Sequence, residues 1–258
     1  MPVPENQFKR ALAAGQVKFG CWLGLADSFS AEQMSQAGFD WLVIDGEHAP
    51  NDLRSTLAQL QVIAASDAHA VVRVPVGETY MLKQMLDAGA QTVLVPMVET
   101  ADQARQLVRD VTFPPHGDRG VGYALGRASR FGTIADYGTT ADAQICLLVQ
   151  VENRRGLAAL DEILAVEGVD GVFIGPADLA ADMGHIGNAD HPDVQAVIMD
   201  ALARIRAAGK APGILSTQDK MTNDALEAGA QFVAVGADVL LLGAAARTLA
   251  TKWQATKA

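Results

Sequence analysis

The stretch AGAQTVLV (88–95) joins the end of a predicted helix to the start of a predicted strand. Two other stretches have the same form, AGFDWLVI (37–44) and AGAQFVAV (228–235). In each, the glycine can adopt the left-handed conformation that closes a helix, and the apolar run then continues as a strand. This recurring junction indicates a fold built from repeated strand–helix units.

Eight short runs rich in Val, Ile and Leu predict eight strands. They lie at residues 19–25, 41–46, 70–75, 92–98, 145–152, 171–176, 211–216 and 232–238. Helical patterns separate most of them, at residues 30–38, 52–66, 79–89, 101–111 and 193–209. Strands that are apolar almost throughout are typical of a parallel sheet covered on both faces.

Eight alternating units predict an α/β fold with one domain over residues 1–258, a single (β/α)8 TIM barrel. A doubly wound open sheet is the alternative. No G-x-G-x-x-G motif follows the first predicted strand, which argues against a dinucleotide-binding form of that sheet.

The composition narrows the classes of partner. The chain is 50% hydrophobic and carries a formal net charge of −10. Nucleic acid and anionic membrane surfaces are poor partners for it, because both bind clustered Lys and Arg. Cys21 and Cys146 fall inside predicted strands, as expected of reduced, buried thiols in a cytoplasmic protein. The N-terminus lacks the apolar segment of a signal peptide, and no apolar run approaches the length of a membrane span.

Residues 112–140 form a long Gly- and Arg-rich insert that interrupts the alternation. Long connections in compact domains are usually functional or disordered. This insert places Arg119, Arg127 and Arg130 in an otherwise acidic chain. That charge favours an ordered loop near an anionic ligand.

Polar residues follow most of the predicted strands, at the ends that meet in the mouth of a TIM barrel. They are Asp45, Glu47, His48, Arg73, Glu99, Gln150, Glu152, Asp178, Ser216 and Asp238. We therefore expect an active site at this mouth.

Two of these carboxylates suit a metal ion. Gln150 and Glu152 are two positions apart and face the same side of their strand. The next strand lies roughly 4.8 Å away, so Glu152 and Asp178 could reach one ion. Oxygen ligands without a Cys or His cluster suit a hard cation such as Mg²⁺ or Mn²⁺. Two ordinary polar loop ends, or a salt bridge, are the alternative.

Arg73 and His48 each have two interpretations. Arg73 stands inside an apolar strand and must find anions or water, either in a buried ion pair or by holding a substrate carboxylate or oxyanion. His48 is a candidate general base if a carboxylate orients it, and Asp45, Glu47 and Asp87 are the candidates for that carboxylate. The alternative is a histidine in a surface loop.

The lysines argue against one mechanism. No lysine stands at the carboxyl end of a predicted strand, and only Lys220, in a following loop, could approach the mouth. A Schiff-base mechanism is therefore disfavoured.

An ordered set of motifs resembles the metal-dependent class II pyruvate aldolases, the family typified by 4-hydroxy-2-oxoheptanedioate aldolase. The motifs are IDGEHAPND (44–52), RVP (73–75), GAQTVLVPMVET (89–100), GDRGVG (117–122), RASR (127–130), QVEN (150–153) and FIGPADL (173–179). The resemblance runs along almost the whole chain. It implies a TIM barrel and a homohexamer, a dimer of trimers, in which the C-terminal helix around residues 239–253 packs on a neighbouring subunit.

The resemblance also implies a ligand set. Glu152 and Asp178 would bind the divalent metal, Mg²⁺ or Mn²⁺, with Co²⁺ or Zn²⁺ as further candidates. Gln150 and the segment of Gly175, Pro176, Ala177 and Asp178 would hold the donor 2-oxo acid. Leu215 would line the pocket of the acceptor.

The remaining roles concern charge and protons. By the resemblance, Arg73 stabilises the enolate oxygen and His48 handles the proton of the hydroxyl that is formed or cleaved. Asp87 matches the carboxylate that raises the basicity of that histidine, and Asp45 would support the same network.

The implied activity is addition of a pyruvate or hydroxypyruvate enolate to an aldehyde, giving a 4-hydroxy-2-oxo acid, and the reverse cleavage. One alternative is a lyase acting on acyl-CoA esters, like the β subunit of citrate lyase. Another is a non-catalytic binder of small oxo acids, which could dispense with His48.

Overall fold

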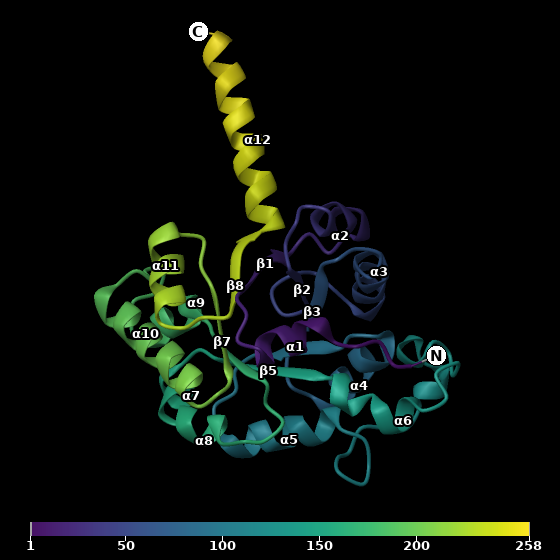
Figure 1. Cartoon of the computed structure of the whole chain (residues 1–258). Coiled ribbons are helices and arrows are strands. Elements are labelled where there is room, and N and C mark those ends of the chain that lie inside the picture. The colour runs from purple at the N-terminus through teal and green to yellow at the C-terminus, as the bar shows by residue number, and fades with distance from the viewer. Residues whose placement is uncertain (1, 258) are drawn as a thin grey trace.

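The computed structural model describes residues 2–257 and has one closed barrel of eight parallel strands (Figure 1). The strands pair in chain order and β8 closes on β1. They are β1 (Lys18–Leu23), β2 (Trp41–Asp45), β3 (His69–Arg73), β4 (Thr92–Val95), β5 (Cys146–Val151), β6 (Gly171–Ile174), β7 (Ala211–Leu215) and β8 (Phe232–Ala237). The predicted TIM barrel is therefore confirmed, and the open sheet is wrong.

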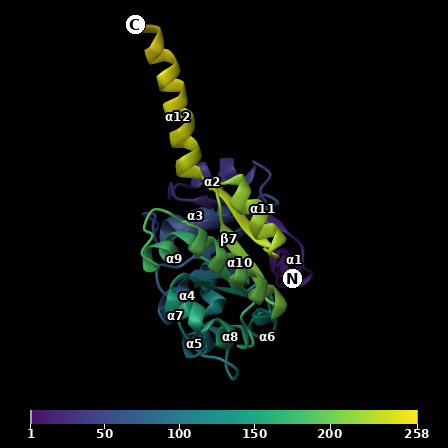
Figure 2. The same ribbon diagram turned by 90° about the vertical axis from the view of Figure 1, so that its left-hand side faces the viewer.

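Helices pack around the barrel, apart from the C-terminal one, which projects from it (Figures 1 and 2). They are α1 (Gln7–Ala13), α2 (Ser28–Ser35), α3 (Leu53–Ile63), α4 (Thr79–Ala88), α5 (Ala101–Val111), α6 (Tyr137–Thr140), α7 (Arg154–Ala158), α8 (Leu160–Leu164), α9 (Pro176–Asp182), α10 (Pro192–Ala207), α11 (Asp219–Glu227) and α12 (Asp238–Gln254). The five predicted helical patterns correspond to α2, α3, α4, α5 and α10. At the junction of α4 and β4, Gly89 has φ 105° and caps the helix, as its sequence predicts.

The interior of the barrel is filled by side chains and closed at the amino ends of the strands by α1. Phe8 of α1 packs on Trp41 and His69, with ring centroids 5.7 and 5.2 Å apart. Burial lowers the pKa of His69 to about 4, so this half-buried histidine is neutral at physiological pH. Cys21 and Cys146 are free, buried thiols, as predicted.

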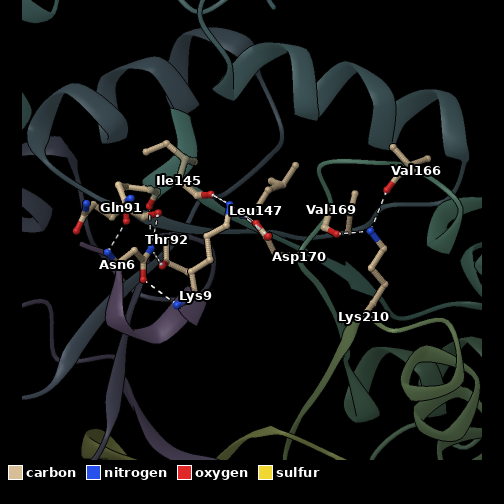
Figure 3. A network of polar contacts seen from close by, with 11 residues as sticks. Asn6, Lys9, Gln91, Thr92, Ile145, Leu147, Val166, Val169, Asp170 and Lys210 are labelled. Atoms are coloured by element: carbon tan, nitrogen blue, oxygen red, sulfur yellow. Dashed lines mark hydrogen bonds and ion pairs between the residues drawn. The ribbon is translucent and has the colours of Figure 1, made fainter. Parts of the chain in front are cut away.

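Polar contacts fasten the N-terminal segment across the same end of the barrel (Figure 3). Asn6 Nδ2 donates to Thr92 Oγ1 at 3.1 Å, and Lys9 Nζ lies 3.3 Å from Asp170 Oδ1. Lys210 Nζ donates to the carbonyl of Val169 at 2.7 Å. These contacts hold the N-terminal segment across the amino end of the barrel, opposite the mouth formed by the carboxyl ends of the strands.

The insert at residues 112–140 is ordered, as predicted. It contains the short helices η1 (Tyr123–Leu125), η2 (Arg127–Ser129) and α6, and it has a small apolar cluster of its own around Phe113 and Tyr137. Because it connects α5 to the start of β5, it lies at the amino end of the barrel. The arginines of the insert are therefore far from the mouth of their own chain.

Helix α12 extends away from the barrel in both views (Figures 1 and 2). Large apolar side chains along it are exposed, among them Leu240, Leu241, Leu242, Leu249 and Trp253. Within residues 2–257, no helix is long and apolar enough to cross a membrane.

Candidate active site

A forked ion pair joins the ends of β2 and β3. Asp45 and Arg73 are partners in the strand register. Arg73 Nε and Nη2 donate to Asp45 Oδ1 and Oδ2 at 2.9 and 2.7 Å, and both side chains are buried. Burial alone would raise the pKa of Asp45, but the hydrogen bonds and charge of Arg73 outweigh it and lower that pKa. Asp45 is thus a charged anchor that fixes the guanidinium.

Glu47 uses the third nitrogen of the same guanidinium. Its Oε2 lies 2.7 Å from Arg73 Nη1. Burial raises the pKa of Glu47 although the charge of Arg73 lowers it, and repulsion from Asp45 and Asp178 raises it further. The sequence had suggested Glu47 only as a partner for His48. Its spacing of two residues from Asp45 is the one signal of this arrangement.

His48 stands at the rim of the mouth. Its side chain is 66% exposed, and its Nε2 lies 3.9 Å from Glu47 Oε2. Asp45 accepts a hydrogen bond from the backbone N–H of His48 rather than from the imidazole. The imidazole can therefore meet a substrate that enters the barrel.

Gln150 and Glu152 face each other at the end of β5, as their spacing predicts. Gln150 Nε2 donates to Glu152 Oε2, and the backbone N–H of Met97 donates to Glu152 Oε1 at 2.9 Å. Burial raises the pKa of Glu152 against these two hydrogen bonds, and the charges of Asp178 and Glu47 raise it further. Glu47, Glu152 and Asp178 therefore share one electrostatic environment.

The segment after β6 passes directly beside Glu152. Gly175 separates β6 from α9, and a Cβ built on it would lie 2.8 Å from Glu152 Cβ and 3.1 Å from Gln150 Nε2. Asp178 is exposed in the first turn of α9. Only glycine at position 175 lets the chain approach the two polar side chains this closely.

The other segment residues complete this side of the mouth. Pro176 is buried and Ala177 is exposed in the first turn of α9, while Leu215 is half-buried at the end of β7 and packs against the barrel interior. These residues form the surface next to Gln150 and Glu152.

The donor set fits a hard divalent cation. Carboxylate oxygens come from Glu152 and Asp178, with Glu47 close by, and oxygen ligands are those that Mg²⁺ and Mn²⁺ prefer. In addition, Gln150 Oε1 is buried without a hydrogen-bond partner among residues 2–257. A buried acceptor of this kind fits a site that receives a polar ligand.

Asp87 does not lie near His48 within one chain. It is in the last turn of α4, just before β4, and so at the amino end of the barrel, whereas His48 follows the carboxyl end of β2. Asp87 Oδ1 lies 3.4 Å from Arg119 Nη2 instead. Its place could have been inferred from the sequence, because residues that precede a barrel strand lie opposite the mouth.

Comparison with known proteins gives consistent results. The model of the HpcH/HpaI aldolase/citrate lyase family matches residues 18–245. A hydroxypyruvate/pyruvate aldolase of Roseobacter denitrificans is 59% identical over 254 residues, which cover 98% of this chain and 99% of that protein. A 4-hydroxy-2-oxo-heptane-1,7-dioate aldolase of Escherichia coli is 55% identical over 251 residues, which cover 97% of this chain and 96% of that protein.

Solved structures share the fold. A crystal structure of an HpcH/HpaI aldolase/citrate lyase family protein from Burkholderia cenocepacia superposes with a TM-score of 0.92 at 42% identity, and covers 96% of this chain and 99% of its own. The citrate lyase β subunit of M. tuberculosis, in complex with oxaloacetate and magnesium, gives a TM-score of 0.58 at 18% identity, over 87% of this chain and 93% of its own.

Proposed function

The chain belongs to the HpcH/HpaI aldolase/citrate lyase family, and we propose that it is a divalent-metal-dependent aldolase, a carbon–carbon lyase that forms and cleaves 4-hydroxy-2-oxo acids. The donor is a pyruvate-type 2-oxo acid, pyruvate or hydroxypyruvate, and the acceptor is an aldehyde. One observation carries this proposal: at the open end of the barrel, Glu47 lies 2.7 Å from the Arg73 guanidinium and 3.9 Å from the His48 imidazole, and the buried Glu152 follows β5 at the same end.

Glu152 and Asp178 would hold the cation, Mg²⁺ or Mn²⁺ rather than Co²⁺ or Zn²⁺, because their donors are oxygens. When bound, such a cation polarises the 2-oxo oxygen of the donor and supports the negative charge of its enolate.

The side chains of the mouth supply the rest of the chemistry. Arg73, fixed by Asp45, donates to the enolate oxygen as charge develops there. Gln150 and the backbone at Ala177 and Asp178 orient the donor. In cleavage, His48 takes the proton of the C4 hydroxyl, and in condensation it returns that proton to the new alkoxide.

The proposed role of Asp87 requires a second copy of the chain. Asp87 is at the far end of its own barrel, so Asp87 can reach His48 only from a neighbouring copy. The exposed apolar side chains of α12 support such an assembly, because an unpartnered apolar surface favours association. We propose the homohexamer, a dimer of trimers, that the family resemblance implies.

The aldolase reading is better supported than the acyl-CoA lyase. Relatives of 55% and 59% identity over almost the whole chain are named aldolases, whereas the citrate lyase β subunit shares the fold at 18% identity. A non-catalytic binder would have no use for an imidazole at the rim of the mouth.

The test is deuterium exchange into pyruvate. The protein is incubated with pyruvate in D₂O, with Mn²⁺, with Mg²⁺ or with EDTA, and the methyl signal is followed by NMR. We expect metal-dependent loss of the signal, because the methyl carbon loses a proton when the enolate forms and takes up a deuteron from solvent when pyruvate is regenerated. In His48→Ala, cleavage of a 4-hydroxy-2-oxo acid should be lost. A folded protein that shows no exchange with any metal refutes the aldolase, and cleavage of malyl-type thioesters would favour the acyl-CoA lyase.

A further inference from the structure

Arg119 is the most unusual charged residue of the chain outside the mouth. Its side chain is 0% exposed, and its Nε and Nη1 have no hydrogen-bond partner among residues 2–257. Buried arginines are normally paired through most of their donors, because unpaired N–H groups in a protein interior cost stability. The insert therefore buries a cation whose N–H groups are only partly satisfied by hydrogen bonds.

An aromatic cluster surrounds the guanidinium. Arg119 Cζ lies 4.3 Å from the ring centroid of Phe113 and 5.7 Å from that of Tyr137. The ring of Tyr123 packs against both, at centroid distances of 5.5 and 5.3 Å. These faces stabilise a cation without binding its N–H groups, so they hold the plane of the guanidinium and leave its edge for other partners.

Backbone hydrogen bonds fix the turn that carries Arg119. Its N–H donates to the carbonyl of Thr112 at 2.9 Å, and that of Asp118 donates to the carbonyl of Arg109 at 2.7 Å. The turn is thus fastened to the end of α5, and the position of Arg119 is set by a helix of the barrel.

One nitrogen of Arg119 makes the polar contacts. Nη2 lies 3.3 Å from Tyr137 Oη and 3.4 Å from Asp87 Oδ1. Gly126 of the insert passes on the other side, where an added Cβ would lie 3.1 Å from the Asp87 carbonyl and 3.5 Å from Asp87 Cβ. The insert therefore contacts the Asp87 carboxylate through Arg119 and lies close to the Asp87 backbone at Gly126.

We propose that Arg119 is a positioning residue, which holds the Asp87 carboxylate in the orientation that lets it serve His48 of a neighbouring copy. This inference rests on the proposed function. In cleavage, the hydroxyl proton passes to His48, the C3–C4 bond breaks, and its electron pair becomes the enolate of the donor while the aldehyde leaves. Asp87 stays unprotonated and orients the imidazole, and Arg119 exchanges no proton.

The central experiment is a double-mutant cycle with Arg119→Lys and Asp87→Asn. Lysine keeps the charge but lacks the planar fork. Cleavage of 4-hydroxy-2-oxoheptanedioate is measured against pH, and deuterium exchange into pyruvate with Mn²⁺ is measured on the same samples. Arg109→Lys is the matched control, because Arg109 pairs with Asp118 at 2.8 and 2.9 Å on the surface of the same region.

We expect Arg119→Lys to lower kcat for cleavage about 10- to 100-fold, as partial loss of general base catalysis would. The ascending limb of its pH profile should move to lower pH, because His48 becomes less basic. Exchange into pyruvate should stay within about twofold of wild type, since removal of a methyl proton from pyruvate does not use His48 in this scheme. The double variant should be no slower than Asp87→Asn alone, and Arg109→Lys should be unchanged.

Tyr137→Phe is the second variant, in case Arg119→Lys folds poorly. It removes one partner of Nη2 and should lower kcat for cleavage and move the pH profile in the same direction as Arg119→Lys, by a smaller factor, with exchange into pyruvate again unchanged. The proposal would be overturned if the fold-losses in kcat of Arg119→Lys and Asp87→Asn multiplied in the double variant. It would also be overturned if Arg119→Lys lost cleavage and exchange equally. If Asp87→Asn cleaves at the wild-type rate, the proposed roles of both Asp87 and Arg119 are refuted. Deuterium exchange by the wild-type protein tests the aldolase activity independently of that result.

Discussion

Substitution of Gly175 by alanine tests whether the segment after β6 shapes the metal site. An alanine Cβ at this position would overlap Glu152 Oε2 and lie 2.8 Å from Glu152 Cβ. The clash involves both Oε2 and Cβ of Glu152, so rotation of the carboxylate alone does not relieve it. The backbone at Gly175, with φ −90° and ψ 99°, suits alanine, so the effect is purely steric.

The magnitude follows from the overlap. Carbon atoms in contact settle about 3.5–4.0 Å apart, so Glu152 must move by about 1 Å. A displacement of about 1 Å in a catalytic group can lower the rate by about 100-fold. We therefore expect kcat/KM for cleavage to fall about 100-fold and the affinity for Mn²⁺ to fall at least about tenfold.

The assay is titration calorimetry with Mn²⁺, followed by cleavage kinetics at saturating metal. Gly236→Ala is the control, because a Cβ at this position in β8 would meet Cys21 Sγ and Leu241 Cδ1 at ordinary contact distances of 3.7 and 3.9 Å. If Gly175→Ala binds Mn²⁺ as tightly as Gly236→Ala, Glu152 is not a ligand held in place by this segment.

Three further predictions concern Glu152 as the proposed metal ligand, Arg73 as the proposed enolate-stabilising residue, and the assembly. Burial raises the pKa of Glu152 above 4.5, so its contribution to stability is full below that pH and is lost as pH rises through the raised value. Glu152→Gln should therefore raise the Tm of the EDTA-treated protein at neutral pH and abolish the increase in Tm caused by Mn²⁺. An unchanged Mn²⁺ response in thermal scans would contradict this. Arg73→Lys loses the forked bond to Asp45 and should slow exchange into pyruvate about 100-fold, whereas exchange at the wild-type rate would remove Arg73 from enolate stabilisation. Leu249→Asp places a charge among the exposed apolar side chains of α12; light scattering should show a smaller assembly and cleavage should fall with it, and an unchanged mass would exclude this helix from the interface.

Much of the barrel can be predicted from the sequence because the patterns that indicate its strands and helices are local. The strand runs and the glycine at each junction need only neighbouring residues, and the predicted and observed bounds of the helix at 101–111 coincide. Helix α1 was missed, because its seven residues bury only Phe8, Ala11 and Leu12 and show no sustained periodicity. The direction of α12 could not be predicted from periodicity either. An apolar helix that projects from the barrel has the same composition as one that packs against it.

The site was predicted as a set of residues rather than as a geometry. Strand ends identify what reaches the mouth, but they could not decide between the two interpretations of Arg73. That decision depends on the register of β2 and β3, which places Asp45 directly beside it. The pairing of Asp87 with Arg119 joins residues 32 positions apart through an irregular insert, and no periodic pattern encodes such a contact.

The two carboxylates on Arg73 are not equivalent, and the difference bears on how a substrate could bind. Asp45 accepts two hydrogen bonds from the guanidinium and two from backbone N–H groups, whereas Glu47 contacts the guanidinium only at Nη1. An enolate oxygen that is to bind Arg73 must therefore displace Glu47 and leave Asp45 in place. Glu47 already feels repulsion from Asp178, and a cation held by Glu152 and Asp178 would turn that repulsion into attraction. Under the proposed function, the cation that binds the donor would thus also attract Glu47 away from Arg73 and leave the guanidinium free for the enolate oxygen.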